Sequence, residues 1–212
     1  MNAILYKTKL ISLIALVLLV TACASTQKLS DADRAKYKSA KINDTVVKGP
    51  VFLLAPSGAN IGLMFGAIGG AATAGAAEDS QKAFTAFLEK NSLSIEKIVR
   101  EETTNVLRES GKLAIAGPND NSVPTINISV PQYGFGVTHL LSSNVVPVLQ
   151  IKCEMLDSTG KVLWSESERM LPTIGSPMEA VAWDQIGNNP KRIEEEWRKA
   201  SRYLAKKIVD QL

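Results

Sequence analysis

The sequence is poor in the residues that most catalytic and metal sites need. It has one histidine, His139, and two cysteines, Cys23 and Cys153, in 212 residues. One chain therefore cannot supply a multi-His or multi-Cys metal site. A Ser–His–Asp or Cys–His centre would have to use His139, and no Gly-x-x-x-x-Gly-Lys-Ser/Thr phosphate loop occurs. We therefore expect no catalytic residues, no metal and no cofactor, and we do not expect an enzyme.

An excess of charge of one sign is also missing. The 24 Lys and Arg residues are nearly balanced by 21 Asp and Glu residues, which leaves a formal net charge of +3. A nucleic-acid-binding surface needs a stronger concentration of basic residues, so nucleic acid is excluded as a partner. Hydrophobic residues make up 45% and charged residues 21%. These fractions exclude a disordered chain and a polytopic membrane protein.

The beginning of the chain has the pattern of a secretory signal peptide. Lys7 and Lys9 precede an uncharged, mostly apolar run of 13 residues at 10–22. A spanning helix needs about 20 apolar residues, so this run is too short to cross a bilayer. A short apolar run behind two lysines at the start of a chain is typical of a signal peptide. We predict that residues 1–22 are removed from the mature protein.

The apolar run ends in Val20-Thr21-Ala22-Cys23. This tetrapeptide resembles the lipobox of bacterial lipoproteins, in which the cysteine is acylated and becomes the first residue after cleavage. The resemblance implies that Cys23 carries the lipid anchor, and two or more acyl chains hold a protein stably on a membrane. Ala24 and Ser25 follow in place of the aspartate typical of inner-membrane retention. The resemblance therefore implies the periplasmic face of the outer membrane of a Gram-negative cell.

The rest of the chain divides by composition into a tether and one domain. After Cys23, the stretch to residue 44 is polar and charged, so we predict that residues 23–44 are the lipidated cysteine and a flexible tether. Residues 45–212 are predicted to form a single periplasmic α+β domain. The expected sheet is mainly antiparallel, with about four to five strands and helices packed on one face. The predicted elements are a strand at 45–55 bent at Gly49-Pro50, helices within 78–110 interrupted at Asn91-Ser92, strands at 112–116, 125–137, 145–156 and 161–170, and helices that begin at Ser176 and Asn189.

A Gly/Ala-rich segment at 60–77 interrupts this pattern. Gly62, Gly66 and Gly70 are spaced by four residues, and Ala74 continues the series. On a helix these positions form a groove of small residues that lets another helix approach closely. The segment resembles the glycine zippers of several bacterial envelope lipoproteins. Three interpretations stay open: a helix or loop packed within the domain, a contact between copies of the chain, and contact with the membrane.

Individual side chains can also be assigned from the pattern. Cys153 falls on the apolar face of an alternating strand, which predicts a buried and inert thiol. Trp164 and Val162 are predicted to share one face of the last long strand. His139 is predicted to be a loop residue. In the last helix, an apolar stripe is predicted from Ile193, Trp197, Ala200, Leu204 and Ile208.

The element order, together with the hairpin over residues 151–164, resembles small periplasmic lipoprotein domains. These include the N-terminal domain of TolB, CsgG, and auxiliary lipoproteins of ABC-type lipid transport. The families work by binding partner proteins, so the resemblance implies a non-enzymatic binding or scaffolding component with envelope proteins as partners. Three alternatives stay open: an oligomeric or membrane-inserting lipoprotein that uses the Gly62/Gly66/Gly70 zipper, an auxiliary lipoprotein of a transport system, and a hydrolase that acts on envelope material.

Overall fold

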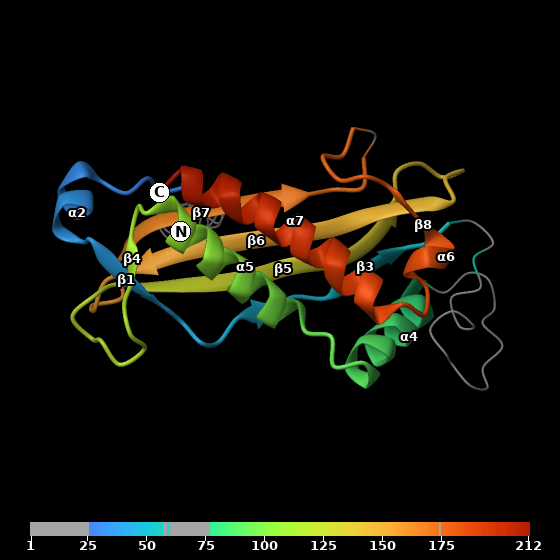
Figure 1. Ribbon diagram of the computed structural model, residues 1–212, viewed down its shortest axis with the longest axis horizontal. Helices are drawn as coiled ribbons and strands as arrows, with labels where there is room; N and C mark the ends of the chain where they lie inside the picture. The colour runs from blue at the N-terminus through green and yellow to red at the C-terminus, as the bar shows by residue number, and fades with distance from the viewer. Residues whose placement is uncertain (1–25, 57–58, 60–76, 174) are drawn as a thin grey trace, which may run out of the picture.

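The computed structural model describes residues 26–56, 59, 77–173 and 175–212. The signal peptide, Cys23 and the zipper positions Gly62, Gly66, Gly70 and Ala74 lie outside these ranges, so the predictions on them stay predictions. Within the described residues, a mixed sheet carries helices on one face (Figure 1). The elements are α2 (Asp31–Lys36), β1 (Ser39–Ile42), β2 (Val47–Lys48), β3 (Val51–Leu54), α4 (Ala77–Lys90), α5 (Ile95–Ser110), β4 (Ala114–Ile115), β5 (Thr125–Val137), β6 (Asn144–Leu156), β7 (Val162–Met170), β8 (Val181–Ala182), α6 (Trp183–Ile186) and α7 (Pro190–Asp210).

The centre of the sheet is the antiparallel array β5–β6–β7. β5 and β6 pair along almost their whole length, from Thr125↔Leu156 to Val137↔Val145. The predicted break at Pro131 is a register shift between Ser129 and Gln132, so β5 continues as one strand. The turn between β6 and β7 is held by the Asp157 carboxylate, which accepts from the amides of Thr159 at 2.8 Å and Lys161 at 3.0 Å.

The outer part of the sheet is parallel. β1, β2 and β3 pair one after another with β5, and all three run parallel to it. β4 pairs in parallel with β1 and completes a sheet of eight strands. The α+β class is therefore confirmed, whereas a mainly antiparallel sheet of four to five strands is only partly right. Strands of two to four residues carry too little alternation to reveal their number or direction.

The interruption at Gly49-Pro50 separates β2 from β3. Pro50 has no N–H to give to the ladder. A Cβ on Gly49 would lie 2.0 Å from the carbonyl oxygen of Pro131, so the two backbones approach more closely than any side chain allows. The predicted bend in the first strand is therefore confirmed.

Most of the predicted helix boundaries are also confirmed. The Ser94 hydroxyl accepts from the Lys97 amide at 3.1 Å at the start of α5, and Gly111 ends this helix in the left-handed region at φ 63°. Asn189 begins α7, since its side chain accepts from the Arg192 amide at 3.1 Å. The helix predicted to begin at Ser176 is wrong. The Ser176 hydroxyl accepts from Met178, two residues on, and the chain then extends to join β6 as β8.

The core lies between the sheet and the helices. The predicted stripe on α7 is confirmed, with Ile193, Trp197, Ala200, Leu204 and Ile208 all buried. Trp164 is buried as well, but it does not share a face with Val162. A register shift at the start of β7 places Trp164 opposite Met155 and Val162 opposite Leu156, so the two side chains point to opposite faces.

The flexible tether predicted for residues 23–44 is wrong for its described part, residues 26–44. Gln27 pairs with Ser165 on β7, and Leu29 is buried. The Ser30 hydroxyl accepts from the Asp33 amide and starts α2, and β1 then enters the sheet. The segment is polar overall, but three of its apolar side chains, Leu29, Ala40 and Ile42, are buried. Their burial stabilises the position of the segment on the domain.

Candidate interaction surface

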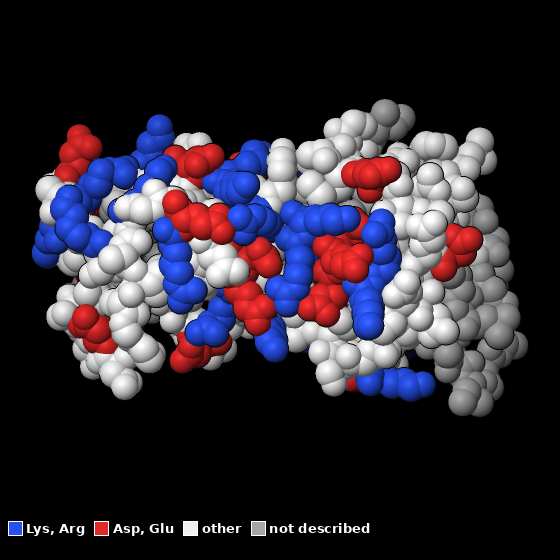
Figure 2. Space-filling view, in the orientation of Figure 1, with Lys and Arg blue, Asp and Glu red and all other residues white. Residues whose placement is uncertain are grey.

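One end of the sheet carries little charge. β3, β5 and β7 run in the same direction, so their C-terminal ends meet there, together with the β5–β6 connection and the loop between β7 and β8. In residues 138–143 and 171–182 the only Lys, Arg, Asp or Glu is Glu179. Figure 2 shows basic and acidic side chains gathered over α5 and α7 and becoming sparse toward this end. We call it the uncharged end.

Large apolar side chains are exposed at the uncharged end. Leu140 and Leu141, at the tip of the β5–β6 connection, are 76% and 92% exposed. Leu54 at the end of β3 and Leu171 after β7 are partly exposed nearby. Single exposed leucines are ordinary, but an adjacent, highly exposed pair on a surface with little charge is typical of an interaction site.

Hydrogen bonds within the turn hold the two leucines outward. The Ser142 amide donates to the His139 carbonyl oxygen at 2.9 Å, which closes the turn around Leu140 and Leu141. The Ser142 hydroxyl accepts from the Asn144 amide at 3.0 Å and donates to the Asn144 carbonyl oxygen at 2.9 Å. Because the backbone is fixed on both sides, the leucine side chains project from a defined turn.

A cavity of about 380 Å³ lies beside the tip, on the side of the β7–β8 loop. Thr138, His139, Thr173 and Ser176 give it polar groups, and Val146 and Met178 give it apolar surface. His139 is an exposed loop residue, as predicted. Among the described residues, no hydrogen bond joins its ring to a hydroxyl or carboxylate, and no cluster of His, Cys, Asp or Glu has the geometry of a metal site.

A second cavity, of about 480 Å³, lies between α4 and the β2–β3 edge. Tyr133 and Val51 contribute apolar surface, and Lys48 and Glu89 contribute charge. The Lys48 ammonium lies 2.6 Å from the Glu96 carboxylate. Burial raises the pKa of Tyr133 above its ordinary value of 10.0. The cavity therefore has a mixed lining of apolar and charged side chains.

On the surface formed by α5 and α7, basic and acidic side chains form ion pairs with each other. The Arg198 guanidinium lies 2.9 Å from Glu101, 3.2 Å from Glu102 and 2.9 Å from Glu194. Burial opposes the charged form, but the hydrogen bonds that Arg198 donates to these carboxylates raise its pKa above the ordinary value. Arg202 and Glu109 add a contact of 2.6 Å between the same helices. These pairs fasten α5 to α7.

Of the functional side chains considered from sequence, the structure describes two. Cys153 is 1% exposed, so the predicted burial of its thiol is confirmed, and burial raises the pKa of this thiol to about 12. His139 borders the smaller cavity. The sequence reasoning missed the leucine pair. The available signal was two adjacent leucines between the end of one strand and the Ser142-Ser143 turn residues.

Comparison with known proteins gives structural likenesses only. No family model matches the chain, and no curated protein matches it. Two PelC dodecamers from Paraburkholderia phytofirmans are 16% and 15% identical, with TM-scores of 0.35 and 0.34. The alignments cover 88% and 82% of this chain and 91% and 94% of the other. Protein XCC0632 from Xanthomonas campestris, described as DUF330, is 12% identical over 81% of this chain and 91% of its own, with a TM-score of 0.36. Likenesses of this size assign neither a family nor a function.

Proposed function

We propose that the protein is a lipid-anchored, non-enzymatic component of the Gram-negative envelope that binds another envelope protein through its uncharged end. The single observation that carries the binding role is the exposed pair Leu140 and Leu141 on a turn fixed by Ser142. Burying two leucine side chains in a partner contributes several kcal/mol, at about 1.5–3 kcal/mol for each. Adjacent exposed apolar side chains on a surface with little charge are typical of a site that another protein covers.

The lipobox-like sequence at Cys23 supports the anchor and the compartment. Among the described residues, no helix is both long and apolar enough to cross a bilayer. The absence of a catalytic role rests on the low content of His and Cys. The alternatives of self-assembly through the zipper, and of service to a transport system, use the same anchor and differ in the partner.

The binding role is tested by exchanging the leucine pair for serines in the full chain. Leu140→Ser with Leu141→Ser should remove a cross-linked partner that the wild type captures in intact envelopes. The matched control is Val47→Ser, because Val47 is 67% exposed but lies on β2, away from the uncharged end. Capture that survives the double substitution would overturn the role of this surface. Loss of a cross-link between two copies of the chain would identify self-assembly instead.

A further inference from the structure

The first described residues of the chain are fixed to the outer edge of β7. The Gln27 amide donates to the Ser165 carbonyl oxygen at 2.8 Å, and the Ser165 amide donates back to the Gln27 carbonyl oxygen at 2.9 Å. The Gln27 side chain donates to the Val162 carbonyl oxygen at 2.8 Å. Three hydrogen bonds therefore attach a single residue to β7.

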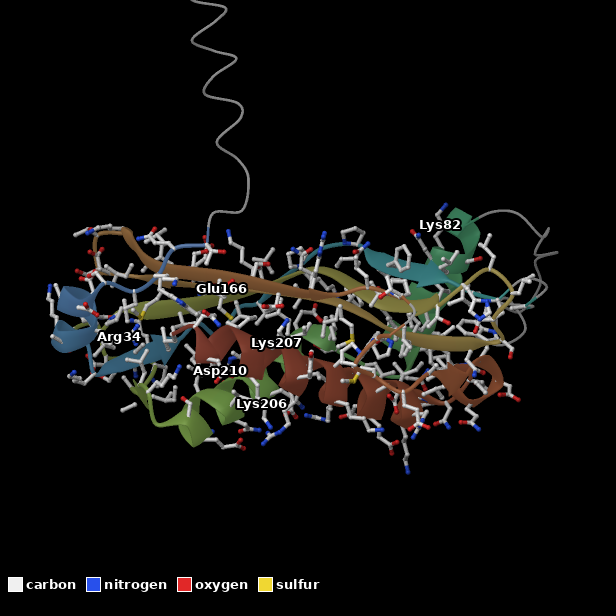
Figure 3. The ribbon with its side chains drawn as sticks, turned by 90° about the horizontal axis from the view of Figure 1, so that it is seen from above. Arg34, Lys82, Glu166, Lys206, Lys207 and Asp210 are labelled. Atoms are coloured by element: carbon white, nitrogen blue, oxygen red, sulfur yellow. The ribbon has the colours of Figure 1, made fainter. Side chains whose placement is uncertain are left out.

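The chain that follows Gln27 is held as well. Leu29 is 4% exposed and packs into the core. Arg34 in α2 donates to the carbonyl oxygen of the C-terminal residue, Leu212. Figure 3 shows Arg34, in α2, at one end of the molecule and Glu166, in β7, closer to its middle. Residues 27–42 thus connect the β7 edge with β1, which pairs with β5 on the side away from β6 and β7.

This attachment limits how far the domain can lie from a lipid carried by Cys23. Four residue steps separate Cys23 from Gln27, and a fully extended chain spans at most about 3.6 Å per residue, or about 14 Å in all. We propose that the β7 edge of the sheet faces the lipid bilayer, within about 14 Å of the acylated residue. The inference rests on the proposed function, because it requires the acylation of Cys23.

The chemistry of the β7 edge favours a lipid surface over an added protein strand. An open edge strand offers unpaired amides to another chain. Here the backbone amide and carbonyl of Ser165 are already hydrogen-bonded to Gln27, and the Glu166 carboxylate accepts from the Ser167 amide at 3.1 Å. The amides of Ser165 and Ser167 on the outer edge of β7 are therefore not open to hydrogen bonds with an added strand. Exposed Lys28 and Arg169 flank this part of the edge, and basic side chains beside an anchor are attracted to anionic headgroups.

The orientation is tested with the acylated full chain in vesicles of phosphatidylethanolamine and phosphatidylglycerol. One surface cysteine is introduced in each of three variants, Lys28→Cys, Arg169→Cys and Val47→Cys, and labelled with a bimane fluorophore. The lipids carry a nitroxide quencher on the headgroup. Val47 is the matched exposed control, because β2 is separated from β7 by β5 and β6, or about three strand spacings of ~4.8 Å. Quenching at residues 28 and 169 should exceed quenching at residue 47, because the two sites lie closer to the headgroups.

Two further measurements separate the orientation from the anchor. A long Gly/Ser linker inserted between Ser25 and Thr26 should remove the difference between the sites, since a flexible chain releases the domain. Flotation of the vesicles reports the anchor itself. Protein that fails to float would overturn the proposed function and this inference together. Protein that floats but is quenched equally at all three sites, or most strongly at residue 47, would overturn the orientation alone.

Discussion

Trp197 on α7 stacks on Phe135 of β5, with ring centroids 5.8 Å apart and an angle of 16° between the ring planes. Phe84 and Tyr133 contact the same indole edge to face, at 6.2 Å and 5.7 Å. The Trp197 Nε1–H donates to the Gly134 carbonyl oxygen at 3.3 Å. This one side chain joins α4, α7 and the centre of the sheet.

We expect Trp197→Ala and Trp164→Ala each to lower the free energy of unfolding by about 3–5 kcal/mol, since both rings are buried. The phenylalanine variants should separate the two sites. Trp197→Phe loses a hydrogen bond, whereas the Trp164 Nε1–H has no acceptor among the described residues. Trp197→Phe should therefore cost about 1 kcal/mol more than Trp164→Phe in urea denaturation. An equal cost would contradict this assignment of the two indoles.

Gly134 is required where β3 meets β5. Its φ is 146°, and a Cβ there would lie 1.7 Å from the carbonyl oxygen of Phe52. Gly134→Ala should therefore separate β3 from β5 and destabilise the protein severely. Gly111→Ala is the control, because Gly111 also has a positive φ but nothing lies within 4 Å of its Cβ position. The control should cost only about 1 kcal/mol. Similar melting temperatures for the two variants would show that the strand contact is not as close as described.

The Lys48–Glu96 pair predicts a pH dependence of stability. Partial burial alone would raise the pKa of Glu96, but hydrogen bonds from Lys48, the backbone and Ser94 bring it below its ordinary value of 4.5. A carboxyl group with a lowered pKa stabilises the fold above 4.5, and this contribution is lost as the pH falls through its folded pKa. The pair is partly exposed, so the contribution is about 0.2–1 kcal/mol.

We therefore expect Glu96→Gln to be less stable than the wild type at neutral pH and to converge with it in acid. Thermal melts across the acid range measure this convergence. The pKa of Lys48 is raised by its hydrogen bond to Glu96, so the same contribution is also lost above its ordinary value of 10.5. A constant difference between variant and wild type at every pH would contradict a role for the ionised pair.

Cys153 provides a probe of folding. Its thiol is buried, and burial raises its pKa to about 12, so it is protonated and shielded at neutral pH. In a Cys23→Ser chain, Ellman's reagent should react with Cys153 at least about 100-fold more slowly in the native state than in urea. Rapid native reaction would show that the β6 core opens. The same property lets introduced surface cysteines be labelled while Cys153 is retained.

The long, periodic elements could be predicted from the sequence. The 13-residue strands β5 and β6 alternate clearly over residues 125–130 and 149–156, and the α7 stripe that includes Trp197 and Ile208 marks its buried face. The helix boundaries at Ser94, Gly111 and Asn189 could also be predicted, because each depends on a local hydrogen bond or turn made by that residue.

Structural features that depend on residues far apart in the chain could not be predicted from the sequence. β2 has two residues, and its parallel direction is set by β5, which lies far along the chain. Gln27 is an ordinary polar residue until Ser165 and Val162 present carbonyl oxygens to it. For the same reason composition alone suggested a tether where the structure has a fixed segment. The exposure of Leu140 and Leu141 depends on the turn closed by the hydrogen bond from the Ser142 amide to the His139 carbonyl oxygen.

The modification of Cys23 is the central claim, because the anchor, the compartment and the orientation all depend on it. Mass spectrometry of the N-terminal peptide of the protein purified from envelopes measures it directly. We predict a mature chain that begins at Cys23 and carries acyl groups on the thiol and the amino nitrogen, and we predict that Cys23→Ser abolishes both the acylation and cleavage at this site. A mature N-terminus elsewhere, or an unmodified Cys23 thiol, would contradict the account.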